Sequence, residues 1–174
     1  MRPAPAGMAA HTPVHRATAP RRLRNAMGRF ATGVTVITTR DGDSAHGMTA
    51  NGVLSVSLDP PLVLVSLGRC RMAEMLPRTG RYAISVLAEE QAPLAAHFAG
   101  RATPGARPSL VDLRGLPVVE GALAHLVCRV SALHPAGDHC LWVGRVEHME
   151  HRDGAPLLFY AGAFHGLGAA TPAR

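Results

Sequence analysis

The most restrictive feature of this sequence is a succession of short strand-like segments that follow one another across tight turns. Residues 34–39 (VTVITT) are all β-branched, which favours a strand, and Asp41 and Gly42 after them are typical of a hairpin turn. Further strands are expected over residues 54–58, 62–67, 82–87, 122–133, 140–149 and 156–160. Because strands follow strands, a βαβ series is excluded. The pattern predicts a mainly β fold, an antiparallel barrel that leaves few open edges.

The side-chain pattern of two of these segments predicts where they lie. Residues 53–58 alternate apolar and small polar side chains, so we expect one face in a core and the other toward a polar environment. Residues 62–67 are almost all apolar, which is typical of a fully buried strand.

Only short helices are expected. Leu23, Met27 and Phe30 fall on one side at helical spacing, and Pro77 is expected to close a single helical turn before it. The predicted helices cover residues 20–30, 72–76 and 89–100, and residues 101–117 have so little pattern that we expect a loop there.

Length, composition and charge place the chain among globular proteins. With 174 residues, of which 47% are apolar, it is long enough for one domain with a real core, and no apolar run reaches the length of a membrane span. The net charge of +6 comes from residues 1–29, which hold six arginines and no acid, whereas residues 30–174 hold twelve of each sign. A nucleic-acid reader carries its basic face on the folded body, so no nucleic-acid partner is expected. We interpret residues 1–19 as a disordered extension and residues 20–174 as the domain.

Several kinds of reactive site lack support. All eighteen basic residues are arginine, which excludes a Schiff-base lysine and a phosphate-loop lysine. Cys70, Cys128 and Cys140 form no CxxC pair, so we interpret them as free thiols of a cytoplasmic protein. The ten histidines show no tight ligand spacing, and no metal site is expected.

Three segments are candidates for chemistry, each with a plainer alternative. Residues 47–53 (GMTANGV) have little bulk, so their backbone N–H groups could approach a flat ring, but they also fit an ordinary glycine-bounded turn. Arg69 and Arg71 are two residues apart after a buried strand, as in a phosphate clamp or a solvated basic turn. Asp138 could orient His139 in the turn between two long strands, although an isolated loop histidine is more often a surface residue.

Taken together and in order, these segments resemble a known family. The strings RNAMGRFATGVTVITT, GMTANGVLSVSLDPPLVLVSLG, HFAG, GALAHLVCRV, AGDHCLWVGRV and PLLFYAGAFHGL are similar to those of short-chain flavin reductases, the reductase components of two-component flavin monooxygenases. The resemblance runs from about residue 23 to residue 167. It implies a Greek-key, FMN-binding split β-barrel that forms homodimers with the flavin near the subunit interface. It also implies an NAD(P)H:flavin oxidoreductase, which reduces FMN or FAD by hydride transfer and supplies reduced flavin to a partner monooxygenase.

The resemblance further implies which residues hold the two nucleotides. The flavin is expected against Thr49, Ala50, Asn51, Gly52, Val53, Ser55 and Val56, its phosphate at Arg69, Cys70 and Arg71, and its far end near Ala99, Gly100 and Arg101. The family's Gly-Asp-His motif matches Gly137, Asp138 and His139, and its histidine is expected beside the nicotinamide, where it assists docking. Phe164 and His165 are expected to line the same pocket. We expect the small polar residues 49–51 to donate hydrogen bonds to the flavin.

Some alternatives and preferences complete this interpretation. No arginine pair is placed for a ribose 2′-phosphate, which favours NADH over NADPH. A split barrel that stores or carries flavin without reducing it is the main alternative. A barrel of the pyridoxamine-phosphate-oxidase or haem-handling type is another, and the 137–139 loop argues against it.

Overall fold

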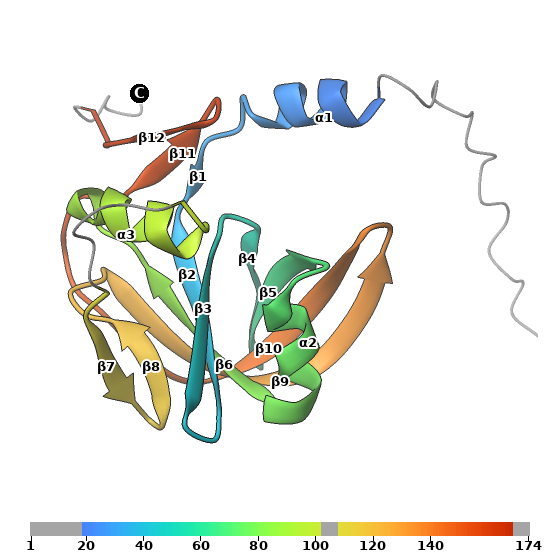
Figure 1. The fold of residues 1–174 in the computed structure, drawn as a ribbon, viewed down its shortest axis with the longest axis vertical. Coiled ribbons are helices and arrows are strands. Elements are labelled where there is room, and N and C mark those ends of the chain that lie inside the picture. The colour runs from blue at the N-terminus through green and yellow to red at the C-terminus, as the bar shows by residue number, and fades with distance from the viewer. Residues whose placement is uncertain (1–18, 102–107, 169–174) are drawn as a thin grey trace, which may run out of the picture.

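The strands form one large sheet and two small ones in the computed structural model, which describes residues 19–101 and 108–168 (Figure 1). The seven-stranded sheet has the order β3-β2-β6-β9-β10-β5-β4, and its neighbours all pair antiparallel. Its members are β2 (Thr35–Asp41), β3 (Ser44–Ala50), β4 (Val53–Leu58), β5 (Pro61–Gly68), β6 (Arg81–Val86), β9 (Ala124–Ala136) and β10 (His139–His151). The small sheets contain β1 (Thr32–Gly33), β11 (Leu158–Tyr160) and β12 (Ala163–His165), and β7 (Leu110–Leu113) with β8 (Leu116–Val119). The predicted mainly β, antiparallel architecture is confirmed.

The two edge strands of the large sheet, β3 and β4, are consecutive in the chain, and this forces the sheet to curl. Six strand spacings would separate the edges of a flat sheet by roughly 29 Å. Only Asn51 and Gly52 connect the two strands, and such a link spans about 11 Å at most. The sheet therefore bends round until its edges meet, without strand pairing between β3 and β4. Asn51 and Gly52 lie at this split in the barrel.

Two core clusters hold the split end in place. Ile37, Val65, Leu67, Tyr82 and Trp142 belong to the cluster inside the barrel, which the short helix α2 (Arg71–Thr79) covers with Met72 and Leu76. A second cluster around Val34, Val36, Leu87 and Leu157 packs against Phe98, Phe159 and Phe164. It fixes α3 (Ala92–Phe98) and the β11–β12 hairpin beside the end of β3.

The second predicted helix is longer than expected. Helix α2 passes through Pro77 and ends at Gly80, whose φ of +63° is left-handed and whose N–H donates to the Leu76 carbonyl at 2.9 Å. A proline near the last turn removes one backbone hydrogen bond, whereas the glycine supplies the conformation that terminates the helix. The prediction that Pro77 closes the helix is wrong.

The segment expected as a loop contains a hairpin. Strands β7 and β8 pair across Arg114 and Gly115, whose φ values of +55° and +86° are those of a tight hairpin turn. Leu116 and Val118 pack against Ala83 and Val127, so the hairpin covers the large sheet. The expected loop is therefore wrong over residues 110–117, and residues 102–107 lie outside the described residues.

The burial predicted for two strands is also corrected. Apart from Val53, the apolar side chains of β4 do not face a core, because Leu54, Val56 and Leu58 are 61%, 48% and 89% exposed on an edge strand. Strand β5 is buried only at alternate positions, Val63, Val65 and Leu67, with half-buried residues between them.

The helix near the N-terminus confirms the prediction for that segment, and it projects from the barrel (Figure 1). Helix α1 (Ala19–Met27) leaves Leu23, Met27 and the nearby Phe30 exposed. The predicted extension over residues 1–18 lies outside the described residues, and Ala19 belongs to α1.

Candidate functional site

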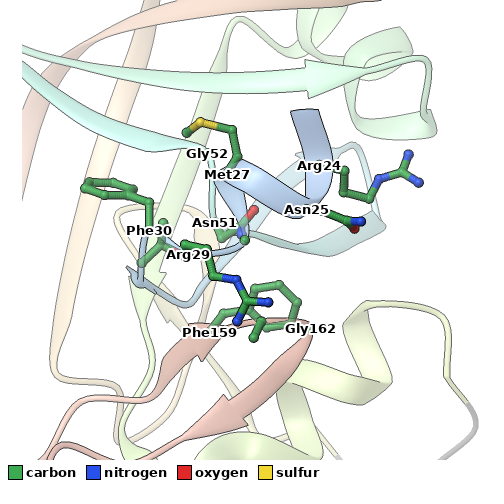
Figure 2. Close-up of a pocket in the computed structure, with 12 residues that line it drawn as sticks. Arg24, Asn25, Met27, Arg29, Phe30, Asn51, Gly52, Phe159 and Gly162 are labelled. Carbon is green, nitrogen blue, oxygen red and sulfur yellow. The ribbon is translucent and has the colours of Figure 1, made fainter. Parts of the chain in front are cut away.

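Two adjoining cavities open at the split between β3 and β4. The larger, the α1 cavity, has a volume of about 650 Å³ and lies between the end of α1, the β3–β4 connection and the β11–β12 turn (Figure 2). The smaller, the α3 cavity, has about 160 Å³ and lies between the end of β3, the residues after α3 and the β11–β12 hairpin. Asn51 and Phe159 line both cavities, so the two spaces adjoin each other.

The α3 cavity gathers six of the residues predicted to hold nucleotides. Residues far apart in the chain meet there: Thr49, Ala50, Asn51, Ala99, Arg101 and Phe164, together with Val34 and Phe159. Phe159 and Phe164 pack edge to face with their ring centroids 5.7 Å apart. Gly52 lines the α1 cavity with Asn51.

Close contacts between β3 and α3 set the width of the α3 cavity. The Thr49 hydroxyl donates a hydrogen bond to the Ala95 carbonyl at 2.6 Å. Gly47 faces the Phe98 ring so closely that a Cβ at residue 47 would lie 2.7 Å from the ring. The hydroxyl hydrogen of Thr49 is thus used within the protein in this structure. The hydroxyl oxygen keeps lone pairs that can accept a hydrogen bond.

Asp138 and His139 form a pair at the tip of the β9–β10 hairpin. The Asp138 carboxylate lies 2.8 Å from Nδ1 of His139, which therefore donates to it. The pKa of Asp138 is lowered below its ordinary value, mainly by this hydrogen bond and to a smaller extent by the charge of His139. His139 is opposite Gly68 on β5, and its Nε2 would be 3.4 Å from a Cβ there. The ring is therefore held over the end of β5 with Nε2 on the side away from the carboxylate.

The predicted phosphate turn follows directly after Gly68. Cys70 precedes the first turn of α2 in an extended conformation, and its thiol lies 3.7 Å from the Met48 sulfur. The charge of Arg71 acts on His46, whose pKa is lowered mainly by burial and to a smaller extent by this positive charge. Arg69, Cys70 and Arg71 thus lie near His139 at the end of β5, and none of these residues lines the α1 or α3 cavity.

The other predicted residues lie outside both cavities. Val53 packs against the barrel core, whereas Ser55 and Val56 are exposed on the edge strand β4. Gly100 follows α3 with a φ of +76°, and the His165 ring contacts that of Tyr160 on the β11–β12 hairpin.

The sequence analysis missed the residues that α1 and the β11–β12 turn contribute. Arg24, Arg29 and Phe30 line the α1 cavity, as do Phe159 and Gly162 (Figure 2). The excess of arginine before residue 30 is a sequence signal that could have indicated Arg24 and Arg29. Their position beside residues 51 and 52 depends on tertiary packing, which the sequence does not show.

Other classes of site were also sought in the described residues. Residues 19–101 and 108–168 contain no group of three His, Cys, Asp or Glu side chains placed to hold a metal ion. No helix in the same ranges has the length and apolarity needed to cross a membrane.

Comparisons with known proteins agree with the predicted family. Residues 27–168 match the model of the flavin reductase like domain. An NADH-dependent flavin reductase from a Rhodococcus species is 56% identical over 160 residues, which cover 90% of this chain and 87% of that protein. The reductase component of 4-hydroxyphenylacetate 3-monooxygenase from Thermus thermophilus is 40% identical over 147 residues, covering 83% and 95%.

Solved structures agree with the sequence matches. The NADH:FAD oxidoreductase SgcE6 of Streptomyces globisporus, in complex with NAD and FAD fragments, superposes with a TM-score of 0.81 at 34% identity, covering 90% of this chain and 98% of that chain. The match with the family model spans most of this chain, and the relatives are similar over most of their own length. The chain therefore belongs to the flavin reductase family.

Proposed function

We propose that this protein is an NADH-dependent flavin reductase, which reduces FMN or FAD and supplies the reduced flavin to a separate flavin-dependent monooxygenase. The observation that carries the proposal is the α3 cavity, where residues that the family resemblance assigns to the flavin meet from β3, β12 and the segment after α3. The Rhodococcus relative is named an NADH-dependent flavin reductase, which supports NADH as the donor.

The residues of the α3 cavity fit a flavin. A flavin ring is flat and apolar on its faces and polar at one edge. Phe159 and Phe164 offer aromatic surface, Ala50 and Ala99 leave room, and Asn51 brings a polar side chain. A bound flavin accepts a hydride from the reduced nicotinamide. The residues of this chain bind and orient the two nucleotides and need no general base of their own.

We propose that His139 helps to dock the nicotinamide nucleotide. The Asp138 carboxylate holds the His139 ring through a hydrogen bond from Nδ1. Because the pKa of Asp138 is lowered, this carboxylate stays ionised at more acidic pH than an ordinary aspartate. His139→Ala is expected to raise the KM for NADH about fivefold and to change the KM for flavin less than twofold. Steady-state kinetics with each substrate varied in turn measure both values, and Asp138→Asn should give a smaller change in the same direction. An unchanged KM for NADH together with an unchanged kcat would disprove this role.

The test of the proposed function is NADH oxidation, followed at 340 nm in air with and without added flavin. We expect oxidation only when FMN or FAD is present, and the flavin with the higher kcat/KM identifies the preferred substrate. Flavin that binds without NADH or NADPH oxidation would favour the alternative, a barrel that carries flavin. Extensive dialysis provides a second test, because a flavin that serves as a substrate should be removed from the protein by dialysis.

We also propose that the protein works as a homodimer. Its support is apolar surface that one chain leaves uncovered, Leu54, Val56 and Leu58 on β4 and Leu23 on α1. Both surfaces lie next to the split in the barrel, so a second copy that covers them would border the cavities. Light scattering coupled to size-exclusion chromatography should give twice the chain mass, and Leu58→Glu should lower it. A single-chain mass for the unaltered protein would rule out the dimer.

The remaining parts of the functional assignment are proposals of the same kind. Relatives named as monooxygenase or halogenase reductase components support a partner that consumes reduced flavin. Three free cysteines and the use of NADH fit the cytoplasm. The domain limits of 20–174, after an extension of residues 1–19, enclose the family match.

A further inference from the structure

The positive charge of the α1 cavity is not balanced by acidic side chains in its lining. Two of its lining residues, Arg24 and Arg29, are cationic, and its lining includes no aspartate or glutamate. The nearest acid along the chain is Asp41, which pairs with Arg78 instead. In the described part of the chain, neither arginine is within 4.0 Å of a carboxylate oxygen. A cavity of this kind favours an anionic ligand.

The walls of the cavity are held together by specific contacts. The Ala161 N–H donates to the Gly28 carbonyl at 2.9 Å and joins the β11–β12 turn to the end of α1. Ala161 and Gly162 both have positive φ, +50° and +88°, so the turn is tight. Figure 2 shows the Arg29 side chain extending toward Phe159 and Gly162, while Phe30 and Arg24 lie at opposite ends of the cavity.

The lining offers apolar as well as cationic contacts. Met27, Phe30 and Phe159 provide apolar and aromatic surface, and Asn25 and Asn51 provide amides. A ligand that uses all of them has a flat aromatic part and a phosphate part. Guanidinium groups bind phosphate with two parallel hydrogen bonds, and aromatic rings stack on purines. The volume of about 650 Å³ is in the range of small-molecule and cofactor sites.

We propose that the α1 cavity binds the adenosine diphosphate half of a dinucleotide, with Arg29 on the phosphates. This inference rests on the proposed function, because both FAD and NADH carry that half and either one is a substrate. Asn51 and Phe159 line both cavities, so the α1 cavity adjoins the α3 cavity and the two spaces are within reach of one extended ligand. Arg29 thereby becomes a residue that distinguishes dinucleotides from mononucleotides.

The first experiment measures binding without turnover. Isothermal titration of the full-length protein with ADP-ribose is compared for Arg29→Ala, Arg29→Lys and Arg22→Ala. Arg22 is a matched control, since it is an exposed arginine of α1 outside the cavity lining. We expect Arg29→Ala to raise the Kd about tenfold, Arg29→Lys to raise it less, and Arg22→Ala to change it less than twofold.

The second experiment identifies the source of the adenosine diphosphate half. If it belongs to FAD, Arg29→Ala raises the KM for FAD and leaves that for FMN unchanged. If it belongs to NADH, the variant raises the KM for NADH with either flavin and leaves that for reduced nicotinamide mononucleotide unchanged. Absence of both FMN and FAD reduction by the unaltered protein would refute the proposed function, whereas the ADP-ribose titration would still test the cavity.

Three outcomes would overturn the inference. The first is an ADP-ribose Kd that is the same for Arg29→Ala and the unaltered protein. The second is an equal effect of Arg22→Ala, which would indicate a general charge effect. The third is a change in the molecular mass of Arg29→Ala in light scattering, which would make the cavity a contact between subunits.

Discussion

Replacing Gly144 with alanine is expected to destabilise the protein by about 3 kcal/mol, the upper part of the range for added volume in a packed core. Gly144 lies on β10, and a Cβ there would be 2.7 Å from Cζ of Tyr82 and 3.0 Å from Cβ of Cys128. Tyr82 and Cys128 are both fully buried, so neither can move aside into solvent. Burial also raises the pKa of the Cys128 thiol to about 12, as expected for a neutral group inside the barrel.

Urea unfolding followed by circular dichroism measures this loss. Gly33→Ala is the control, because a Cβ on Gly33 would meet no atom within 4 Å, and we expect less than about 1 kcal/mol for it. Combining Gly144→Ala with Tyr82→Phe removes the hydroxyl that lies closest to the new methyl group and should restore part of the stability. Equal stability of Gly144→Ala and Gly33→Ala would show that the barrel tolerates the added volume.

Replacing Gly47 with alanine is expected to weaken flavin use, although residue 47 does not line either cavity. A Cβ on Gly47 would lie 2.7 and 2.9 Å from two atoms of the Phe98 ring and 3.4 Å from a methyl carbon of Thr38. Thr38 is fully buried and closes the other side, so we expect the Phe98 ring, and α3 with it, to move away from β3. Ala99 and Arg101, which follow α3, then shift as the wall of the α3 cavity. We expect the KM for the preferred flavin to rise about tenfold, with a loss of stability of about 2 kcal/mol.

Flavin kinetics and urea unfolding of the same sample separate the two effects. In the double variant Gly47→Ala with Phe98→Leu, the smaller side chain makes room for the methyl group, so the KM for flavin should return toward its original value. A Gly47→Ala protein with an unchanged KM and lowered stability would show that the position of α3 does not control the cavity.

Strand positions were accessible from the sequence because side-chain chemistry is local. The β-branched run at 34–39 and the Asp41-Gly42 turn predict β2 and its hairpin, which are confirmed. The β7–β8 hairpin was missed although its Arg114-Gly115 turn is a usable signal, since its strands are only four residues each. The exposed apolar face of β4 was unpredictable, because alternation shows that a strand has an apolar face and does not show what covers it.

The sequence by itself determined the class of fold, the sites of most turns and, through a series of ordered motifs, the flavin reductase family. These depend on local propensities and on residues that stay close along the chain. The tertiary structure alone decided which candidate residues meet. The fold brings residues 49–51, 99, 101, 159 and 164 to one cavity and leaves residues 69–71 and 139 at the end of β5. The tertiary structure also placed Arg29 in the α1 cavity, since a hydrogen bond between residues 28 and 161 joins segments over 130 positions apart. Local sequence patterns carry no information about a contact between residues so far apart in the chain.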